Sequence, residues 1–199
     1  MSDSSAPSRQ SLRFVESDAP IQEPVTKFGG QPVWLESPAW PMSAALGRPM
    51  RFLGQIRLPG EQVRLAYLFL TEDYPEDYED VVDTFEPDSG ENAFFAQPGE
   101  PADFYPVATI AKGPTFGPDH RVETEPFDGE VDVDDFATRL FGSPQWLQGD
   151  ESPGEPFRFI GQFDSTGDLP FDVNFGDAGV GYAFLDESTG QGRFLWQCS

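Results

Sequence analysis

Two stretches of the chain, PMRFLGQIRL at 49–58 and PFRFIGQFDS at 156–165, place a glutamine inside an apolar run. A glutamine amide offers two N–H donors and one carbonyl acceptor, so Gln55 and Gln162 could line a groove and hydrogen-bond a peptide or a small ligand. Buried, the same amides would satisfy loop backbone in place of water. The glycine before each glutamine lets that backbone approach closely. We favour the framework role and keep ligand binding as the alternative.

Two further pairs of residues recur in the same order, the arginines inside the two stretches and the tryptophans before them. Arg51 and Arg158 are two of only 12 Lys and Arg residues, against 35 Asp and Glu. Ion pairing with acidic loops is therefore favoured over anion recognition. Trp34 and Trp146 each follow a Gly/Pro turn. A large aromatic residue at such a place commonly packs into a hydrophobic core, whereas a tryptophan that faces a cleft anchors a binding partner. We favour the core for both.

An acidic run at 72–91 interleaves aromatic residues with carboxylates, including Tyr74, Asp77, Tyr78 and Asp80. Such a surface suits the Arg and Lys side chains of a basic partner through charge pairing and cation–π contacts. A solvated, self-repelling loop has the same composition. Both interpretations stay open.

Residue types typical of catalytic or metal sites are few. His120 has only an adjacent aspartate, which does not make a catalytic dyad, and is expected in a surface loop. The single Cys198 excludes an intrachain disulfide and a multi-cysteine zinc site. Asp164, Asp168 and Asp172 could hold calcium, but the EF-hand pattern is missing, so an ordinary turn is favoured and cation binding is left open. We expect no catalytic residue, no metal site and no cofactor.

The sequence segments that would position these residues occur twice in the chain. FGGQPVWLE (28–36) returns as LFGSPQWLQ (140–148), and LAYLFL (65–70) returns as VGYAFL (180–185), on either side of the glutamine stretches. Three blocks in the same order indicate an internal duplication. Each copy reads as a Gly/Pro turn, a Trp-bearing strand, a Phe-x-Gly-Gln strand and a Tyr-x-Phe strand.

The glutamine strands are expected to be central in a sheet. Alternation puts Phe52, Gly54 and Ile56 on one face of the first strand and Leu53 and Gln55 on the other. Both faces are then largely apolar, which is typical of strands with neighbours on either side.

The fold class predicted is mainly β, an α+β fold with little helix. Units of about 50 residues would not bury a good core alone, so the two should pack into one compact domain. Residues 1–20 are expected to be a mobile N-terminal segment, followed by a single domain over 21–199. Within it lie repeat 1 (24–73), an acidic connection (74–139) and repeat 2 (140–199). FYPVATI (104–110) reads as a strand, and 131–141 as a short helix with an aspartate cap.

Charge and hydropathy narrow the function classes. The net charge of −23 repels nucleic-acid phosphates and anionic lipid surfaces. No run of about 18 apolar residues exists, so no membrane span is expected. The start, MSDSSAPSRQSLRF, has no apolar core for a signal peptide, which favours a cytoplasmic protein.

The order Lys-Phe-Gly-Gly-x-Pro-x-Trp, Pro-Met-x-Phe-Leu-x-Gln and Tyr-x-Phe resembles the YwqG-like family, a bacterial family classed as a domain of unknown function. The resemblance covers 24–197 and implies a duplicated β-rich fold, with the activity open. A related eukaryotic group carries a Cys-x-x-Cys before the Gly-x-Pro-Met. Here Ser43 and Leu46 stand at those places, so any metal role of that turn is absent.

These observations favour a non-enzymatic, cytoplasmic protein that binds another protein through its acidic surface, with a basic protein as the candidate partner. One alternative is an immunity or antitoxin protein that neutralises a basic toxin. Another is an enzyme or small-ligand binder that uses a groove between the repeats. The oligomeric state stays open.

Overall fold

The computed structural model describes residues 7–72, 83–126 and 136–199, and every regular element in these ranges is a β-strand. The mainly-β prediction is therefore confirmed. Ten strands form one antiparallel sheet, and β3 (Trp40–Pro41) pairs with β7 (Val107–Ala108) in a second, small sheet. The strands of the large sheet are β1 (Gln10–Glu16), β2 (Lys27–Phe28), β4 (Arg51–Arg57), β5 (Leu65–Leu70), β6 (Asn92–Gln97), β8 (His120–Pro126), β9 (Arg139–Leu140), β10 (Arg158–Asp164), β11 (Val180–Leu185) and β12 (Gly192–Gln197).

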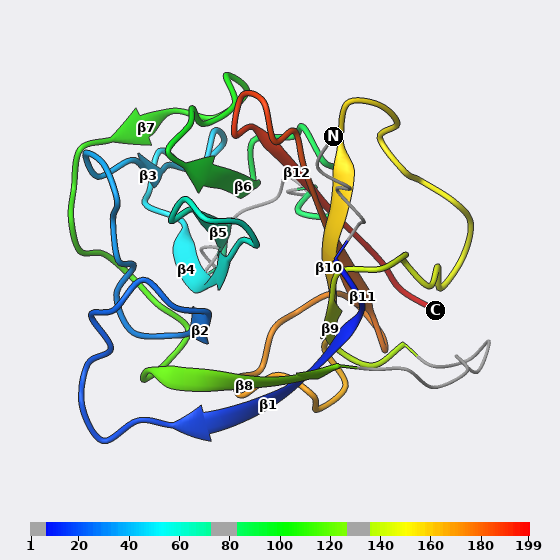
Figure 1. The fold of residues 1–199 in the computed structure, drawn as a ribbon. Coiled ribbons are helices and arrows are strands. Elements are labelled where there is room, and N and C mark those ends of the chain that lie inside the picture. Colours follow the sequence, from blue (N-terminus) through cyan, green and yellow to red (C-terminus); the bar gives the residue numbers. More distant parts are fainter. Residues whose placement is uncertain (1–6, 73–82, 127–135) are drawn as a thin grey trace, which may run out of the picture.

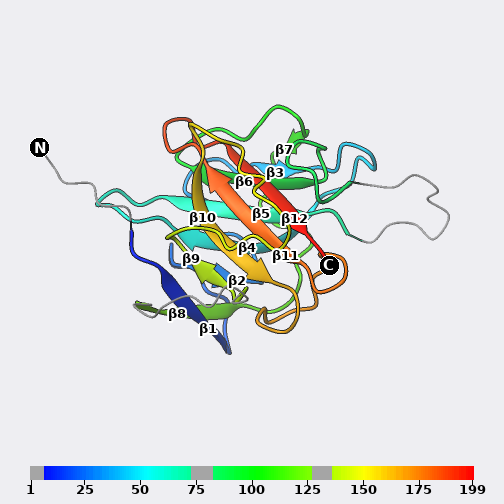
Figure 2. The same ribbon diagram turned by 90° about the vertical axis from the view of Figure 1, so that its right-hand side faces the viewer.

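The large sheet consists of two matching halves. Its order is β12-β11-β10-β9-β1-β8-β2-β4-β5-β6, so β9 to β12 on one side mirror β2 and β4 to β6 on the other. In Figures 1 and 2 the two three-stranded groups face each other, and β1 with β8 joins them. The free edges also meet, because Phe95 bridges to Gln191 and the Ala96 N–H donates to the Gly190 carbonyl at 2.8 Å. The sheet is thus nearly closed and barrel-like.

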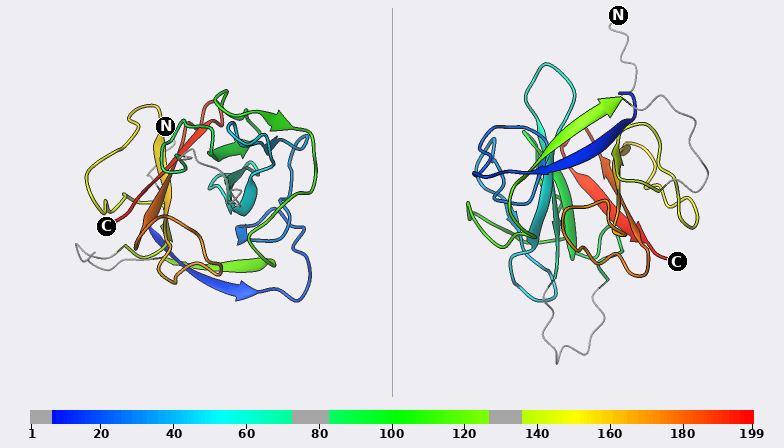
Figure 3. Two further views of the ribbon diagram at one scale, coloured as in Figure 1. Left: turned by 180° about the vertical axis from the view of Figure 1, so that it is seen from behind. Right: turned by 90° about the horizontal axis from the view of Figure 1, so that it is seen from below.

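The halves exchange their first strands. β1 begins the chain but pairs with β9 of the second half, whereas β8 pairs with β2 of the first half. β1 and β8 also pair with each other along their full length, and Figure 3 shows them side by side. The centre of that pairing is Arg13 opposite Glu123, whose side chains form an ion pair. An approximate two-fold axis therefore passes through this pair.

This exchange corrects the predicted boundaries. Residues 10–16 were expected in a mobile segment, yet they form β1, held by neighbours on both sides. Residues 120–126 were expected in a connection without a repeat, yet they form the counterpart strand β8. The two strands share almost no residue types, so their equivalence could not be seen in the sequence.

Strands β4 and β10 are central, as predicted, but their faces differ from simple alternation. A bulge interrupts β4 between Phe52 and Gly54, and β10 has the same bulge between Phe159 and Gly161. Phe52 consequently packs in a different cluster from Ile56, which lies on the inner side with Leu53. The prediction that Phe52, Gly54 and Ile56 share a face was wrong because the bulge adds one residue.

Three apolar clusters result from this arrangement. The inner cluster lies between the halves and takes side chains from both, including Phe28, Leu53, Ile160 and Phe163. One outer cluster covers the first half around Trp40. The other, smaller cluster covers the second half around Tyr182 and Phe184 with partly exposed neighbours. The halves therefore share one core and differ in their outer cover.

Two local predictions were wrong. The described part of the expected helix at 131–141 has no helical turn and enters β9. There the Ala137 carbonyl accepts from Gln162, and the Thr138 N–H donates to Asp168, so the backbone is committed to the sheet. Trp34 and Trp146 lie in irregular loops after their glycines and not in strands.

Candidate functional site

The two predicted glutamines occupy equivalent, fully buried positions. Gln55 Oε1 accepts from the Val33 N–H at 2.9 Å, and its Nε2 donates to the Val25 carbonyl at 2.9 Å. Gln162 makes the matching bonds at 2.9 Å to Gln145 N–H and at 3.2 Å to the Ala137 carbonyl. Both side chains are 0% exposed. The amides fasten loops to the sheet and present no group to a partner.

A third glutamine pair was missed in the sequence. Gln97 at the end of β6 and Gln197 at the end of β12 hold the next loop residues, through bonds such as Glu36 N–H to Gln97 Oε1 at 3.2 Å and Gln148 N–H to Gln197 Oε1 at 3.0 Å. Their flanking sequences share only a Phe-x-x-Gln pattern, at 94–97 and 194–197. That pattern at the end of each apolar strand is the signal that could have revealed the pair.

Tyrosine hydroxyls complete this framework. Tyr67 donates to the Val33 carbonyl at 2.9 Å, and Tyr182 donates to the Gln145 carbonyl at 2.8 Å. Burial raises the pKa of Tyr182 to about 12 and raises the pKa of Tyr67 further. Both phenols therefore stay protonated at neutral pH and serve as structural donors.

The two tryptophans stack alike but are covered differently. Trp34 stacks on Phe69 at 6.2 Å between ring centroids, and Trp146 stacks on Phe184 at 6.0 Å. Trp34 Nε1 donates to the Ala111 carbonyl at 3.1 Å. Within the described residues, Trp146 Nε1 has no such acceptor. Both rings are half-buried, so each packs on the sheet and keeps an accessible edge.

The two arginines have different surroundings. Arg51 approaches Glu72 at 3.7 Å, and its guanidinium lies over the Phe116 ring at 5.9 Å. Arg158 is exposed and has no ion pair in the part of the chain that the structure describes. It lines an open cavity together with Glu187, the counterpart of Glu72. Arg158 is the predicted site residue that lines this cavity.

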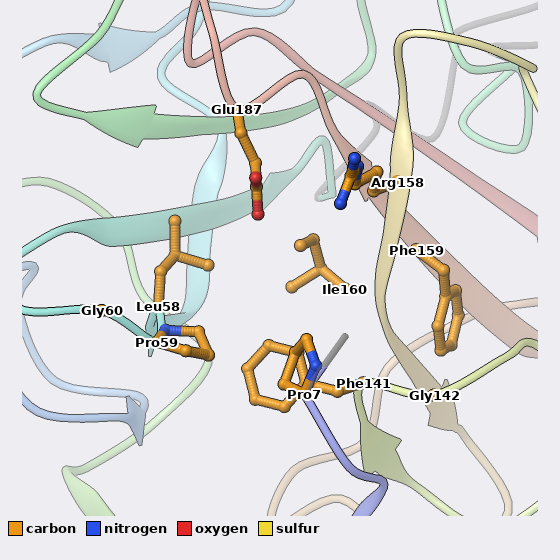
Figure 4. Close-up of a pocket in the computed structure, with 10 residues that line it drawn as sticks. All are labelled: Pro7, Leu58, Pro59, Gly60, Phe141, Gly142, Arg158, Phe159, Ile160 and Glu187. Carbon is orange, nitrogen blue, oxygen red and sulfur yellow. The ribbon is translucent and has the colours of Figure 1, made fainter. Parts of the chain in front are cut away.

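This cavity, of about 580 Å³, lies between the halves. Figure 4 shows Arg158 and Glu187 on one side, Leu58 and Pro59 across from Ile160, and Phe141 with Pro7 below. Phe141 adopts a left-handed backbone with φ 60°, where the first half has Gly29 with φ 69°. A non-glycine residue rarely takes this conformation, and its ring closes part of the cavity wall. The site is apolar with one cation and one anion at its rim.

The acidic run lies partly outside the described residues, and so do Tyr74, Asp77, Tyr78 and Asp80. Its described end forms a turn at 83–88 in which Asp83, Glu86 and Asp88 are exposed. Phe85 is 40% exposed. We call residues 83–88 the acid–aromatic turn. Glu91 is different, because it is buried and accepts from Ser43 Oγ at 2.6 Å and from Ala45 N–H at 2.8 Å.

A buried ion pair was not predicted. Lys27 is 0% exposed and donates to Asp119 and to the carbonyls of Gly29 and Gln31. Desolvation lowers the pKa of Lys27, although Asp119 opposes that shift. A second cavity of about 470 Å³ lies beside Asp119 and is lined by Ile21, Gln31 and other loop residues. The three donated bonds use the ammonium fully, so it locks a loop and is not free to react.

The remaining candidates do not assemble into a reaction centre. His120 Nδ1 lies 3.0 Å from the Pro118 carbonyl, and Cys198 is half-buried near the chain end. Asp164 binds Thr166 while Asp168 caps Thr138 N–H. In the described ranges no three His, Cys, Asp or Glu residues gather as metal ligands. Nor do those ranges contain a helix able to span a membrane.

Comparison with known proteins adds no relative. No family model matches the chain, and no curated protein matches it. The resemblance to the YwqG-like family therefore stays a hypothesis based on the motifs alone.

Proposed function

We propose that this protein acts in the cytoplasm by binding a basic partner protein, without catalysis, through its acidic surface. The described part of that surface is the acid–aromatic turn. The observation that carries the proposal is an exposed aromatic ring, held in place by Trp196, in a turn that also exposes three acidic residues. The resemblance to a family of unknown function is compatible with this role and does not specify it.

The turn is held by bonds from two strands. Asn92 Nδ2 donates to the carbonyls of Thr84 and Glu86, both at 2.9 Å. Trp196 Nε1 donates to Thr84 Oγ1 at 3.2 Å. The Phe85 ring meets the Trp196 ring edge-on, with centroids 5.7 Å apart. A ring fixed in this way loses little conformational freedom when a partner covers it.

Charge favours a basic partner. Asp83, Glu86 and Asp88 are exposed in the same turn as Phe85, on a molecule whose net charge is −23. A field of this sign accelerates association with cationic proteins and weakens as salt increases. Arginine and lysine side chains could pair with the carboxylates and stack on Phe85.

The test is quantitative affinity capture from the native cell with three forms of the chain. The turn variant carries Asp83→Asn, Glu86→Gln and Asp88→Asn. The matched control carries Asp103→Asn, Asp172→Asn and Glu151→Gln, which are exposed, lie elsewhere and change the net charge equally. We expect a basic protein to be lost with the turn variant and kept with the control. Equal recovery with all three forms would remove the turn from the proposal.

A narrower form of the proposal is that the basic partner is a toxin, which the acidic surface masks. This version rests on charge alone. The neighbouring genes test it, because a toxin gene beside this one is expected, and its consistent absence would count against it.

A further inference from the structure

The geometry points to a second binding site, independent of the acid–aromatic turn. The open backbone edge of β10 at Phe159, with the adjoining cavity, binds an extended peptide segment of another protein and takes one aromatic side chain. The duplicated fold supplies the reasoning, because the first half contains the same site already occupied by its own chain.

In the first half, residues 114–116 run beside β4. Phe52 N–H donates to the Pro114 carbonyl at 2.9 Å, and Phe116 N–H donates to the Phe52 carbonyl at 3.2 Å. Thr115 forms a parallel bridge with Phe52 between these bonds. The Phe116 ring packs against the inner cluster, under the Arg51 guanidinium. A three-residue extended segment with an aromatic end thus fills the place.

In the second half, the same backbone groups have no partner in the part of the chain that the structure describes. Phe159 pairs with Phe184 of β11 in the same way as Phe52 pairs with Phe69 of β5. In both strands the bulge directly follows this residue. The N–H and C=O of Phe159 therefore point away from β11, as those of Phe52 point away from β5. Among the described residues nothing pairs with them. The Phe159 ring packs on the outer cluster, so its backbone is the part that faces the cavity.

The residues that line the cavity suit a segment like 114–116 of the first half. The cavity residues Phe141, Arg158 and Ile160 correspond to Gly29, Arg51 and Leu53. Of these, Arg51 lies over the Phe116 ring, and Leu53 belongs to the cluster on which that ring packs. The cavity volume of about 580 Å³ and its apolar walls suit a phenylalanine-sized ring. Arg158 can lie over that ring as Arg51 does over Phe116. Main-chain bonds to an open strand edge with a pocket for one side chain are a recurrent mode of peptide recognition.

The chain's own counterpart residues carry no ring for this cavity. β1 and β8 correspond through Arg13 and Glu123, which makes Ser4, Ser5 and Ala6 the sequence counterparts of 114–116. They lie outside the described residues, and none is aromatic. An aromatic side chain in this cavity therefore does not come from residues 4–6, and we assign it to another molecule.

The test uses a synthetic peptide with the chain's own sequence at 111–118, AKGPTFGP, added to the full-length protein and followed by amide NMR shifts. We expect saturable shifts at Phe159, Ile160 and Phe141, without comparable shifts at Phe52. A peptide with alanine in place of phenylalanine should bind about tenfold more weakly or worse, because it loses the burial of one aromatic ring. N-methylation of the peptide phenylalanine should also weaken binding, because it removes the donor to the Phe159 carbonyl.

Protein variants add a second readout. Arg158→Glu should weaken the peptide roughly two- to fivefold, the effect of an exposed cation–π contact, while Arg48→Glu, at an exposed site elsewhere, should not. No shifts at saturating peptide, shifts centred on another face, or equal binding of all three peptides would overturn the proposal. A further contradicting result would be a Phe159 amide that exchanges slowly in the full chain and fast only after truncation to 7–199. In that case the chain's own N-terminal residues would occupy the edge.

Discussion

Replacing Gln162 with leucine separates a framework role from a binding role. In the structure this side chain bonds the Gln145 N–H at 2.9 Å and the Ala137 carbonyl at 3.2 Å, and it is 0% exposed. Leucine has a similar size but can make neither bond. Each backbone group left without its partner costs about 1–3 kcal/mol. Since both groups lie in partly buried loops that water can reach, we expect a loss of about 2–4 kcal/mol in the free energy of unfolding.

The assay is urea denaturation of the wild type, Gln162→Leu and Gln62→Leu. Gln62 is exposed, so the same chemical change there should alter the free energy of unfolding by less than about 0.5 kcal/mol. Gln55→Leu should lose about as much as Gln162→Leu, because its bonds are equivalent. A loss below about 1 kcal/mol at Gln162, together with lost binding of a partner, would refute the framework role.

Three other perturbations test the same framework. Lys27→Met leaves Asp119 buried without its cation and should cost about 3–5 kcal/mol by urea denaturation, most of it recovered when Asp119→Leu is added. Gly161→Ala places a methyl group 2.8 Å from Leu140 Cδ2 and should cost about 1–3 kcal/mol, whereas Gly149→Ala, with open space around it, should be neutral. Burial raises the pKa of Tyr182 to about 12, so only the unfolded chain loses this proton just above the ordinary value of about 10. Stability should therefore be unaffected by this group below about pH 10 and fall by up to about 1.4 kcal/mol per pH unit between there and about pH 12; a flat profile in alkaline urea titrations would contradict this.

The parts of the fold that the sequence revealed are those with repeated side chains. Tyr67 and Tyr182, or Gln55 and Gln162, make side-chain bonds that only their residue types can make, so both copies keep them and the repeat is visible. The glycines before the glutamines are needed because a methyl group at Gly54 would lie 2.9 Å from the Lys27 carbonyl. Side-chain chemistry and steric fit are readable in this way.

The parts that stayed hidden depend on backbone pairing. β1 and β8 are equivalent only in their pattern of ladder bonds, which any residue can make, so neither the strands nor their exchange was visible in the sequence. The bulge after Phe52 has the same origin. The cavity beside Arg158 forms because the two equivalent halves are covered by different loops. No motif in the second half predicts it, because the segment that fills the equivalent place, 114–116, lies beside the first half.

Amide hydrogen exchange at Phe52 and Phe159 in one sample tests most directly that the halves are the same framework and differ in an open edge. Phe52 N–H bonds to the Pro114 carbonyl at 2.9 Å, and Phe159 N–H has no acceptor in the described residues. The prediction is that Phe159 exchanges at least about 100-fold faster than Phe52 and slows when the 111–118 peptide is added. Equal, strong protection of both amides in the free protein would contradict it.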